Sequence, residues 1–306
     1  MRVAVITLAA GRHSHLLLQQ AGLARGTRGP DHYVIVSMAD PEIAALVVDR
    51  SPTADVLDVS LQSGRLPLAA ARNAGAARAL AAGADVLVFL DVDCVPGPGL
   101  LDGYARAAQD GALLCGTVAY LPPPPARGYR LDELAHLAPP HPARPAPADG
   151  QIVRGGDPRL FWSLSFALTA DTWNHVGGFC EDYTGYGAED TDYAATAARL
   201  GVDLWWVGGA AAYHQHHPTQ NPPVQHVDDI LRNGAIYRRR WGTWPMEGWL
   251  KDFEAQGLVE YVPATHSWRR RTDGSDAQAA TRPVPSRPPE RHGEARGEAT
   301  PAKRQA

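Results

Sequence analysis

The sequence predicts an α/β fold in which a mostly parallel sheet is flanked by helices. Two observations lead to this prediction. Apolar runs of strand length alternate with helical patterns over residues 1–120, as they do in sheets built from strand–helix–strand units. The run Val86–Leu90 is apolar at every position, which is typical of a strand that helices cover on both faces.

The expected strands and helices follow one another in a regular order. The helix predicted at 66–83 is Ala-rich, and Gly83 is suited to close it as a C-cap. In the second half, a strand is predicted at 202–209 and a helix from Glu189 onward. The other predicted strands are 2–9, 32–38, 54–60, 85–91 and 112–121, and the other helices are 14–24, 41–49, 99–109, 227–242 and 245–259.

Two segments differ in composition from the rest of the chain. Residues 121–150 are rich in proline, which removes backbone donors and fixes φ, so we expect an extended surface excursion that can act as a lid. After about Thr265 the chain is polar and rich in Pro, Arg and Glu, which predicts a disordered tail. The prediction is therefore one folded domain over residues 1–264, followed by a tail over residues 265–306.

Composition excludes several kinds of protein. The net charge of −4 argues against a nucleic-acid-binding protein. No apolar stretch approaches the roughly 20 residues that span a bilayer, so we expect no transmembrane segment and a cytoplasmic location. The basic run Tyr237–Gly242 allows a peripheral contact with an anionic membrane, but a solvated helix end is the favoured interpretation.

Two carboxylates end the apolar strand at 85–91. Asp91 and Asp93 are separated by Val92, and side chains at i and i+2 of an extended segment point the same way. Two like charges held together are costly unless a cation lies beside them. A divalent cation would satisfy the pair and would also bridge phosphate oxygens. The alternative is an ordinary turn, in which Asp is common.

A second group of acids lies in "GFCEDYTGYGAEDTDYAATAARLG". Tyr186 offers an aromatic ring for sugar stacking, and Gly187 allows a sharp turn. Glu189 and Asp190 follow at the start of the predicted helix, where a carboxylate can accept a proton from a bound hydroxyl. For Asp192, stabilisation of the helix N-terminus is an equally good explanation.

Three histidines follow the strand predicted at 202–209, in "AAYHQHHP". His214 is adjacent to the strand end and is the best placed to complete a metal site. Carboxylates combined with a neutral imidazole suit Mn²⁺ better than oxygens alone do. His216 and His217 are interpreted as bystanders.

These motifs together resemble those of GT-A glycosyltransferases, which have a Rossmann-like sheet. The sequence "ARNAG" at 71–75 is similar to a segment of the family 2 enzymes. From Phe161 onward the chain most resembles the β-1,4-galactosyltransferase catalytic region, through "DVD" at 91–93, "GFCEDYTGYGAEDTD" at 178–192 and the later His214. The resemblance covers residues 1–245.

The resemblance implies a role for each matching residue. Asp93 and His214 would bind the metal, and Asp91 would bind it through water or bind the ribose. Asp190 would be the catalytic base, with Glu189 positioning it or holding the acceptor. The remaining implied roles are nucleotide-sugar binding by Thr7, Ala9, Asp40, Arg72, Asn73, Asp91 and Val92, and acceptor binding by Tyr186, Gly187 and Glu189.

The implied activity is metal-dependent, inverting transfer of a hexosyl group. The donor would be a nucleotide diphosphate sugar, with UDP-sugars favoured, the acceptor a carbohydrate or other hydroxyl, and the metal Mn²⁺ or Mg²⁺. Residues 1–120 would form the nucleotide-sugar half, 121–150 a Pro-rich loop, and 151–264 the acceptor and catalytic half.

The chain departs from the galactosyltransferase pattern at the metal site. The Met that precedes the metal-binding His by three residues in that family is Ala211 here, so a water or another side chain would have to take its place. Galactose specificity is therefore not carried over. The alternatives are a retaining transferase of the same fold and a non-catalytic nucleotide-sugar or carbohydrate binding module. A sugar-nucleotide pyrophosphorylase is disfavoured, because no lysine precedes Lys251 to bind phosphates.

Overall fold

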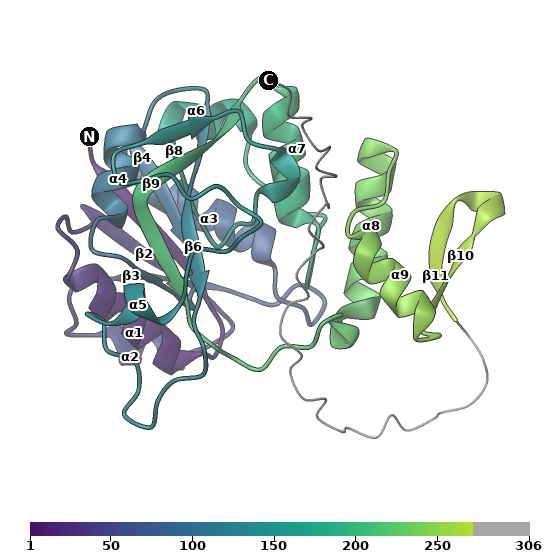
Figure 1. Cartoon of the computed structure of the whole chain (residues 1–306), viewed down its shortest axis with the longest axis horizontal. Helices are drawn as coiled ribbons and strands as arrows, with labels where there is room; N and C mark the ends of the chain where they lie inside the picture. Colours follow the sequence, from purple (N-terminus) through teal and green to yellow (C-terminus); the bar gives the residue numbers. More distant parts are fainter. Residues whose placement is uncertain (272–306) are drawn as a thin grey trace, which may run out of the picture. The chain divides into compact units, whose positions relative to one another are not determined.

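The protein is described by a computed structural model that covers residues 1–271. Its centre is a nine-stranded sheet in the order β3-β2-β1-β4-β8-β6-β9-β5, with β7 paired to β9 (Figure 1). The strands of this sheet are β1 (Val3–Ala9), β2 (His32–Met38), β3 (Asp55–Val59), β4 (Val86–Leu90), β5 (Cys94–Pro96), β6 (Ala112–Tyr120), β7 (Ile152–Arg154), β8 (Ser165–Thr169) and β9 (Asp203–His214).

The prediction of a mostly parallel sheet is confirmed. Strands β1, β2, β3, β4, β6 and β9 run in one direction, and β5, β7 and β8 run against them. The helices are α1 (His13–Ala24), α2 (Glu42–Val47), α3 (Leu68–Ala81), α4 (Leu100–Ala107), α5 (Leu134–Leu137), α6 (Ala170–Val176), α7 (Glu189–Arg199), α8 (Val227–Trp241) and α9 (Glu247–Ala255).

Helices cover the sheet on both faces, as the continuous apolar strands predicted. Alternate residues of one strand face opposite sides, so Val3 and Val5 pack with α1 and α4, whereas Ala4 and Ile6 pack with α3, α6 and α7. The contact with α3 is close, because a Cβ on Gly75 would lie 2.5 Å from Ile6. The glycine of "ARNAG" therefore serves helix–sheet packing.

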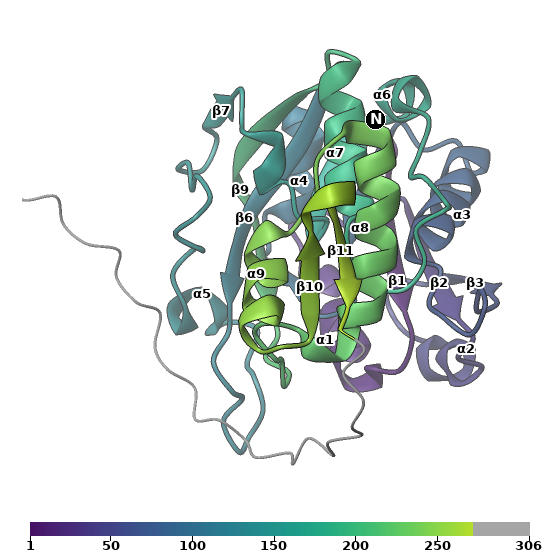
Figure 2. The ribbon, with the colours of Figure 1, turned by 90° about the vertical axis from the view of Figure 1, so that its right-hand side faces the viewer.

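The C-terminal part of the described chain adds a small apolar cluster outside the sheet. Helices α8 and α9 pack with a hairpin of β10 (Val259–Val262) and β11 (Ser267–Arg270) around Ile230 and Phe253 (Figure 2). The sequence prediction placed residues 265–271 in the tail, but the cross-strand pairing with β10 gives them regular structure. Residues 272–306 lie outside the described part of the chain.

The Pro-rich segment 121–150 runs over the surface but is anchored at several points. Leu121 and Leu134 are buried against Val95, and the Arg144 guanidinium lies between the rings of Trp162 and Trp206 at 5.0 and 4.7 Å. That this segment moves as a lid stays a prediction.

No helix of the described residues is long and apolar enough to cross a membrane.

Candidate active site

A cleft with a volume of about 990 Å³ opens at the carboxyl ends of β1, β2 and β4. Ligands bind outside the carboxyl ends of strands in open α/β sheets, so its position agrees with the fold. One wall carries Arg12 and Asp93, and another carries the start of α7. Residues within 243–249, which follow α8 and include the first residues of α9, also line the cleft, mainly with aromatic and apolar side chains.

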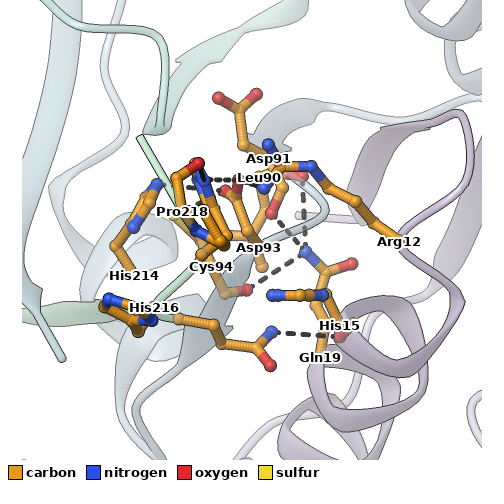
Figure 3. Close-up of polar contacts among 12 residues, drawn as sticks. Arg12, His15, Gln19, Leu90, Asp91, Asp93, Cys94, His214, His216 and Pro218 are labelled. Carbon is orange, nitrogen blue, oxygen red and sulfur yellow. Dashed lines mark hydrogen bonds and ion pairs between the residues drawn. The ribbon is translucent and has the colours of Figure 1, made fainter. Parts of the chain in front are cut away.

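The two carboxylates of "DVD" do not point the same way. The Cys94 amide donates to the Asp91 carbonyl at 2.8 Å, which closes a turn directly after β4. The segment is therefore not extended, and the i, i+2 argument from the sequence was wrong at this point. Figure 3 shows the Asp91 carboxylate directed away from Asp93. Each carboxylate has its own partners among the neighbouring side chains.

Asp93 lies beside two imidazoles and one guanidinium. His214 Nε2 is 3.5 Å from Asp93 Oδ1, and His217 Nε2 is 3.4 Å from Oδ2. Arg12 Nη1 donates to the same Oδ2 at 2.7 Å. Burial alone would raise the pKa of Asp93, but the contact with His217 and the charges of His214 and Arg12 outweigh it and hold the pKa below its ordinary value.

Strand pairing explains how residues so distant in sequence meet. Strand β5 pairs with the end of β9, with Cys94 opposite His214. The backbone amide of Gln215 donates to the Asp93 backbone carbonyl at 2.7 Å. The Gln19 side-chain amide donates to the carbonyls of Asp91 and Cys94 at 2.6 and 3.1 Å (Figure 3). These bonds fix the turn that carries Asp93 against the end of β9.

The cluster of Asp93, His214 and His217 fits a divalent cation. Its three ligand atoms lie within 4.8 Å of one another, and two ligands about 2.0–2.2 Å from one ion lie at most about 4.4 Å apart, so small movements suffice. Burial lowers the pKa of His214, against the influence of Asp93, which keeps the imidazole in its metal-binding neutral form. One carboxylate with two imidazoles suits Mn²⁺.

Asp91 belongs to a second network, around Arg72. The Arg72 guanidinium is almost fully buried, lies 3.5 Å from Asp91 and 3.2 Å from Glu189, and donates to Ser163 Oγ at 2.8 Å. Burial raises the pKa of Asp91 to about 7; Arg72 opposes this, and the nearby Asp93 adds to it. One arginine thus links the end of β4 to the start of α7.

Glu189 and Asp190 line the cleft at the first turn of α7. Burial raises the pKa of both carboxyls; for Glu189 the charge of Asp190 adds to this effect, and Arg72 opposes it in both cases. Glu189 Oε2 has no hydrogen-bond partner within residues 1–271. A buried carboxylate that has a raised pKa and faces a cleft is suited to proton transfer.

The loop before α7 presents an aromatic surface to the cleft. The ring of Tyr186 is stacked on His226 with centroids 4.4 Å apart and lies 6.0 Å from Trp249. Gly187 has φ 95°, and Ala188 has φ 74°, a conformation that costs an L-residue energy and is concentrated at functional sites. Tyr186 and Gly187 both line the cleft, and their role in acceptor binding stays a prediction.

Four residues predicted to bind the nucleotide sugar do not line the cleft. Thr7 is fully buried and donates to Gln19 at 2.8 Å, and Ala9 faces the same core. Their neighbours Leu8 and Ala10 line the cleft instead, because alternate strand residues face opposite sides. Asp40 accepts from the Gly11 amide and contacts the His13 imidazole, at 2.7 and 2.8 Å.

Asn73, the fourth of these residues, joins α3 to the loop before α7. It donates to the Phe179 carbonyl and accepts from the Phe179 amide, at 2.9 and 2.8 Å. Its side chain also donates to Glu181. Arg72, Asp91 and Val92, in contrast, line the cleft as predicted.

Sequence reasoning missed His217 and Arg12 at the site. His217 lies three residues after His214, and the segment beyond β9 brings its Nε2 to 3.4 Å from Asp93 Oδ2. In the expected metal site it would take the place that Ala211 cannot fill. Arg12 follows β1 in the same way that Asp93 follows β4. Its place at a strand end was the one available signal, because the parallel pairing of β1 with β4 sets the two ends side by side.

No protein-family model matches the sequence. No curated protein matches it either. Solved structures are similar in three dimensions: GalNAc-T7 with UDP, GalNAc and Mn²⁺ has a TM-score of 0.51 at 14% identity, over 71% of this chain and 43% of that one. S. aureus TarS 1-349 has a TM-score of 0.50 at 13% identity, over 84% of this chain and 79% of that one.

The chain has a glycosyltransferase fold. At these identities the likeness concerns the fold alone, and the chain spans less than half the length of GalNAc-T7. The closer resemblance of the segment from Phe161 onward to galactosyltransferases stays a prediction.

Proposed function

We propose that the protein is a metal-dependent inverting glycosyltransferase that uses a nucleotide diphosphate sugar, with UDP-sugars favoured. One observation carries the proposal. A single cleft at the carboxyl edge of the sheet combines Asp93, which faces two histidines, with the acid pair of buried Glu189 and partly buried Asp190. The cluster suits a cation–diphosphate complex, and the acid pair suits activation of a hydroxyl.

On the donor side, Asp93, His214 and His217 would hold a divalent cation, which would offset the charge of the departing diphosphate. Asp91 and Val92 line the floor of the cleft beside this cluster and would contact the ribose or the donor sugar. Arg72 holds Asp91 and Glu189 in a fixed arrangement, so neither carboxylate needs to reorganise when substrate binds.

On the acceptor side, Asp190 takes the proton from the acceptor hydroxyl. The oxygen then forms a bond to the anomeric carbon while the bond from that carbon to the diphosphate oxygen breaks, and the configuration inverts. Glu189 holds or orients the acceptor, and the ring of Tyr186 packs against a sugar face. Trp162 and Trp244 line the same cleft and restrict water, which would otherwise compete as acceptor.

The decisive experiment is a screen of UDP- and GDP-sugars with Mn²⁺, followed by Asp190→Asn with the productive donor. Loss of a general base costs about 10²–10⁴-fold in turnover, whereas UDP binding should be retained. Asp182→Asn is the matched control, because this acid is exposed in the same segment and should leave turnover unchanged. Full turnover in Asp190→Asn would refute the assignment of the base.

Two other outcomes separate the alternatives. UDP binding without turnover of any donor would indicate a binding module. Where turnover occurs, the anomeric configuration of the product, measured by NMR, distinguishes inversion from retention. Retention would overturn the single-displacement mechanism but leave the transferase assignment in place.

A further inference from the structure

Arg12 contacts the carboxylate that the proposed function assigns to the metal. Its Nη1 donates to Asp93 Oδ2 at 2.7 Å (Figure 3). His217 Nε2 lies 3.4 Å from the same oxygen. A cation that took this oxygen as its ligand would compete with the guanidinium for it. Without a cation, Arg12 offsets the charge of Asp93.

The loop that carries Arg12 is held in an unusual conformation. Gly11 and Arg12 both have left-handed backbones, with φ 60° and 51°, and such strain in a non-glycine residue persists only where surrounding contacts enforce it. Asp40 supplies two of these contacts, to the Gly11 amide and the His13 ring. The α1 helix then begins at His13, so the strained turn aims the side chain across the cleft.

Arg12 differs from the other two arginines that line the cleft. Arg72 is 4% exposed and is fixed by Asp91, Glu189 and Ser163. Arg159 makes three side-chain hydrogen bonds to Asp157 in its own loop. Arg12 is 37% exposed and, among the described residues, forms an ion pair with Asp93 alone, so it can leave that carboxylate without breaking a buried network.

We infer that Arg12 is a diphosphate-binding residue that occupies the cation's place until metal and donor arrive. The inference rests on the proposed function. When a divalent cation binds at Asp93, the like charge displaces the guanidinium. It then lies at the mouth of the donor site with its donors free, and a guanidinium binds phosphate oxygens through paired N–H groups. The same residue therefore opposes metal binding alone and favours binding of metal with nucleotide.

The test is to measure two affinities in Arg12→Gln. Mn²⁺ binding to the nucleotide-free protein, followed by electron paramagnetic resonance, should become about fivefold tighter, because a competing ion pair is lost. UDP binding at saturating Mn²⁺, followed by calorimetry, should become about tenfold weaker, because a charged hydrogen bond to phosphate is lost. Arg12→Lys keeps the charge and should retain part of the UDP affinity.

The opposite signs separate this role from others. Damage to the fold would weaken both affinities, and a bystander would change neither; either result overturns the inference. Arg25→Gln removes the same charge at the other end of α1, where the side chain is exposed, and should leave both affinities unchanged. If the unaltered protein bound neither Mn²⁺ nor UDP, the proposed function would fail, and the inference with it. If it bound both normally and Arg12→Gln changed neither affinity, the inference alone would fail.

Discussion

At the scale of single residues, the site depends on carboxylates whose charge the fold controls individually. Asp93 is held ionised by the groups around it, whereas burial pushes Asp91, Glu189 and Asp190 toward the protonated form. The difference follows from the partners each one has. Asp93 faces two imidazoles and Arg12, and the other three acids share Arg72 as their nearby positive charge.

We predict that His217 and His214 both bind the metal. We expect His217→Ala to weaken Mn²⁺ binding by at least about tenfold, the loss of roughly 1.4 kcal/mol, because one of three protein ligands is removed. His216→Ala is the control, since this neighbouring side chain is exposed and outside the cluster. Equal Mn²⁺ affinities for the two variants, measured by calorimetry, would show that His217 is not a ligand.

The rate should depend on pH through Asp190. Burial raises the pKa of this carboxyl above its ordinary value of 3.8, and Arg72 opposes the rise. A general base must be ionised, so kcat should fall as pH drops through the raised pKa, at a higher pH than an exposed aspartate would give. Arg72→Gln should move this acid limb further up, because the opposing charge is lost. Profiles of kcat at saturating Mn²⁺ between pH 4 and 9 test both statements; a flat profile down to pH 4 would contradict the first.

At the scale of elements, α7 carries the acid pair and is tied to α8 by one buried carboxylate. Asp192 accepts hydrogen bonds from Tyr183 Oη, Arg240 Nε and Trp241 Nε1, at 3.1, 2.6 and 2.7 Å. The helix-start explanation for Asp192 is therefore incomplete, because two of its three partners, Arg240 and Trp241, lie on α8. The tie fixes the direction of α7 and hence the position of Asp190.

Asp192→Ala should be strongly destabilising. It removes the shared acceptor of three donors and leaves Arg240 without its carboxylate, which should cost about 3 kcal/mol of the free energy of unfolding. The control is Arg239→Gln, because Arg239 is exposed and precedes Arg240 on α8. It should change the free energy of unfolding by less than about 0.5 kcal/mol. Urea denaturation of both variants provides the measurement, and a loss below 1 kcal/mol in Asp192→Ala would argue against the tie.

At the scale of the whole molecule, the C-terminal helices complete a site that the sheet alone leaves open. Asn233 on α8 is fully buried and donates to the carbonyls of Thr184, Tyr186 and Gly187 at 3.1, 3.2 and 2.9 Å. Asp229 accepts from the Tyr186 amide at 3.1 Å. The loop that precedes the acid pair is thus shaped by a segment far along the chain.

Asn233→Asp should impair both stability and activity. A carboxylate would face the three carbonyl oxygens that now accept from the amide, and a buried unpaired charge should cost about 3 kcal/mol or more. Asn233→Ala loses only the hydrogen bonds and should cost about 1–3 kcal/mol. Asn233→Asp should have the lowest melting temperature and the highest acceptor KM, with Asn233→Ala between it and the unaltered protein. Equal values for all three proteins would show that the loop does not depend on α8.

The sequence by itself determined the alternating strands and helices of the first 120 residues, because their apolar periodicity is local and each run is long enough to be read alone. It also singled out Asp93, His214, Glu189 and Asp190 as candidates, since their residue types and their places at element ends limit what they can do. The short strands β5 and β7 were not predictable, because their pairing with β9 is what makes them strands.

Only the tertiary structure decided which side chains share one site. The turn after β4 points the side chains of Asp91 and Asp93 in different directions, and the alternation of β1 points Thr7 and Ala9 into the core. Neither orientation is visible in the sequence. His217 and Arg12 became part of the site because two strand ends and one turn meet beside Asp93. Such meetings arise from pairings between distant segments, which a local pattern of residues does not encode.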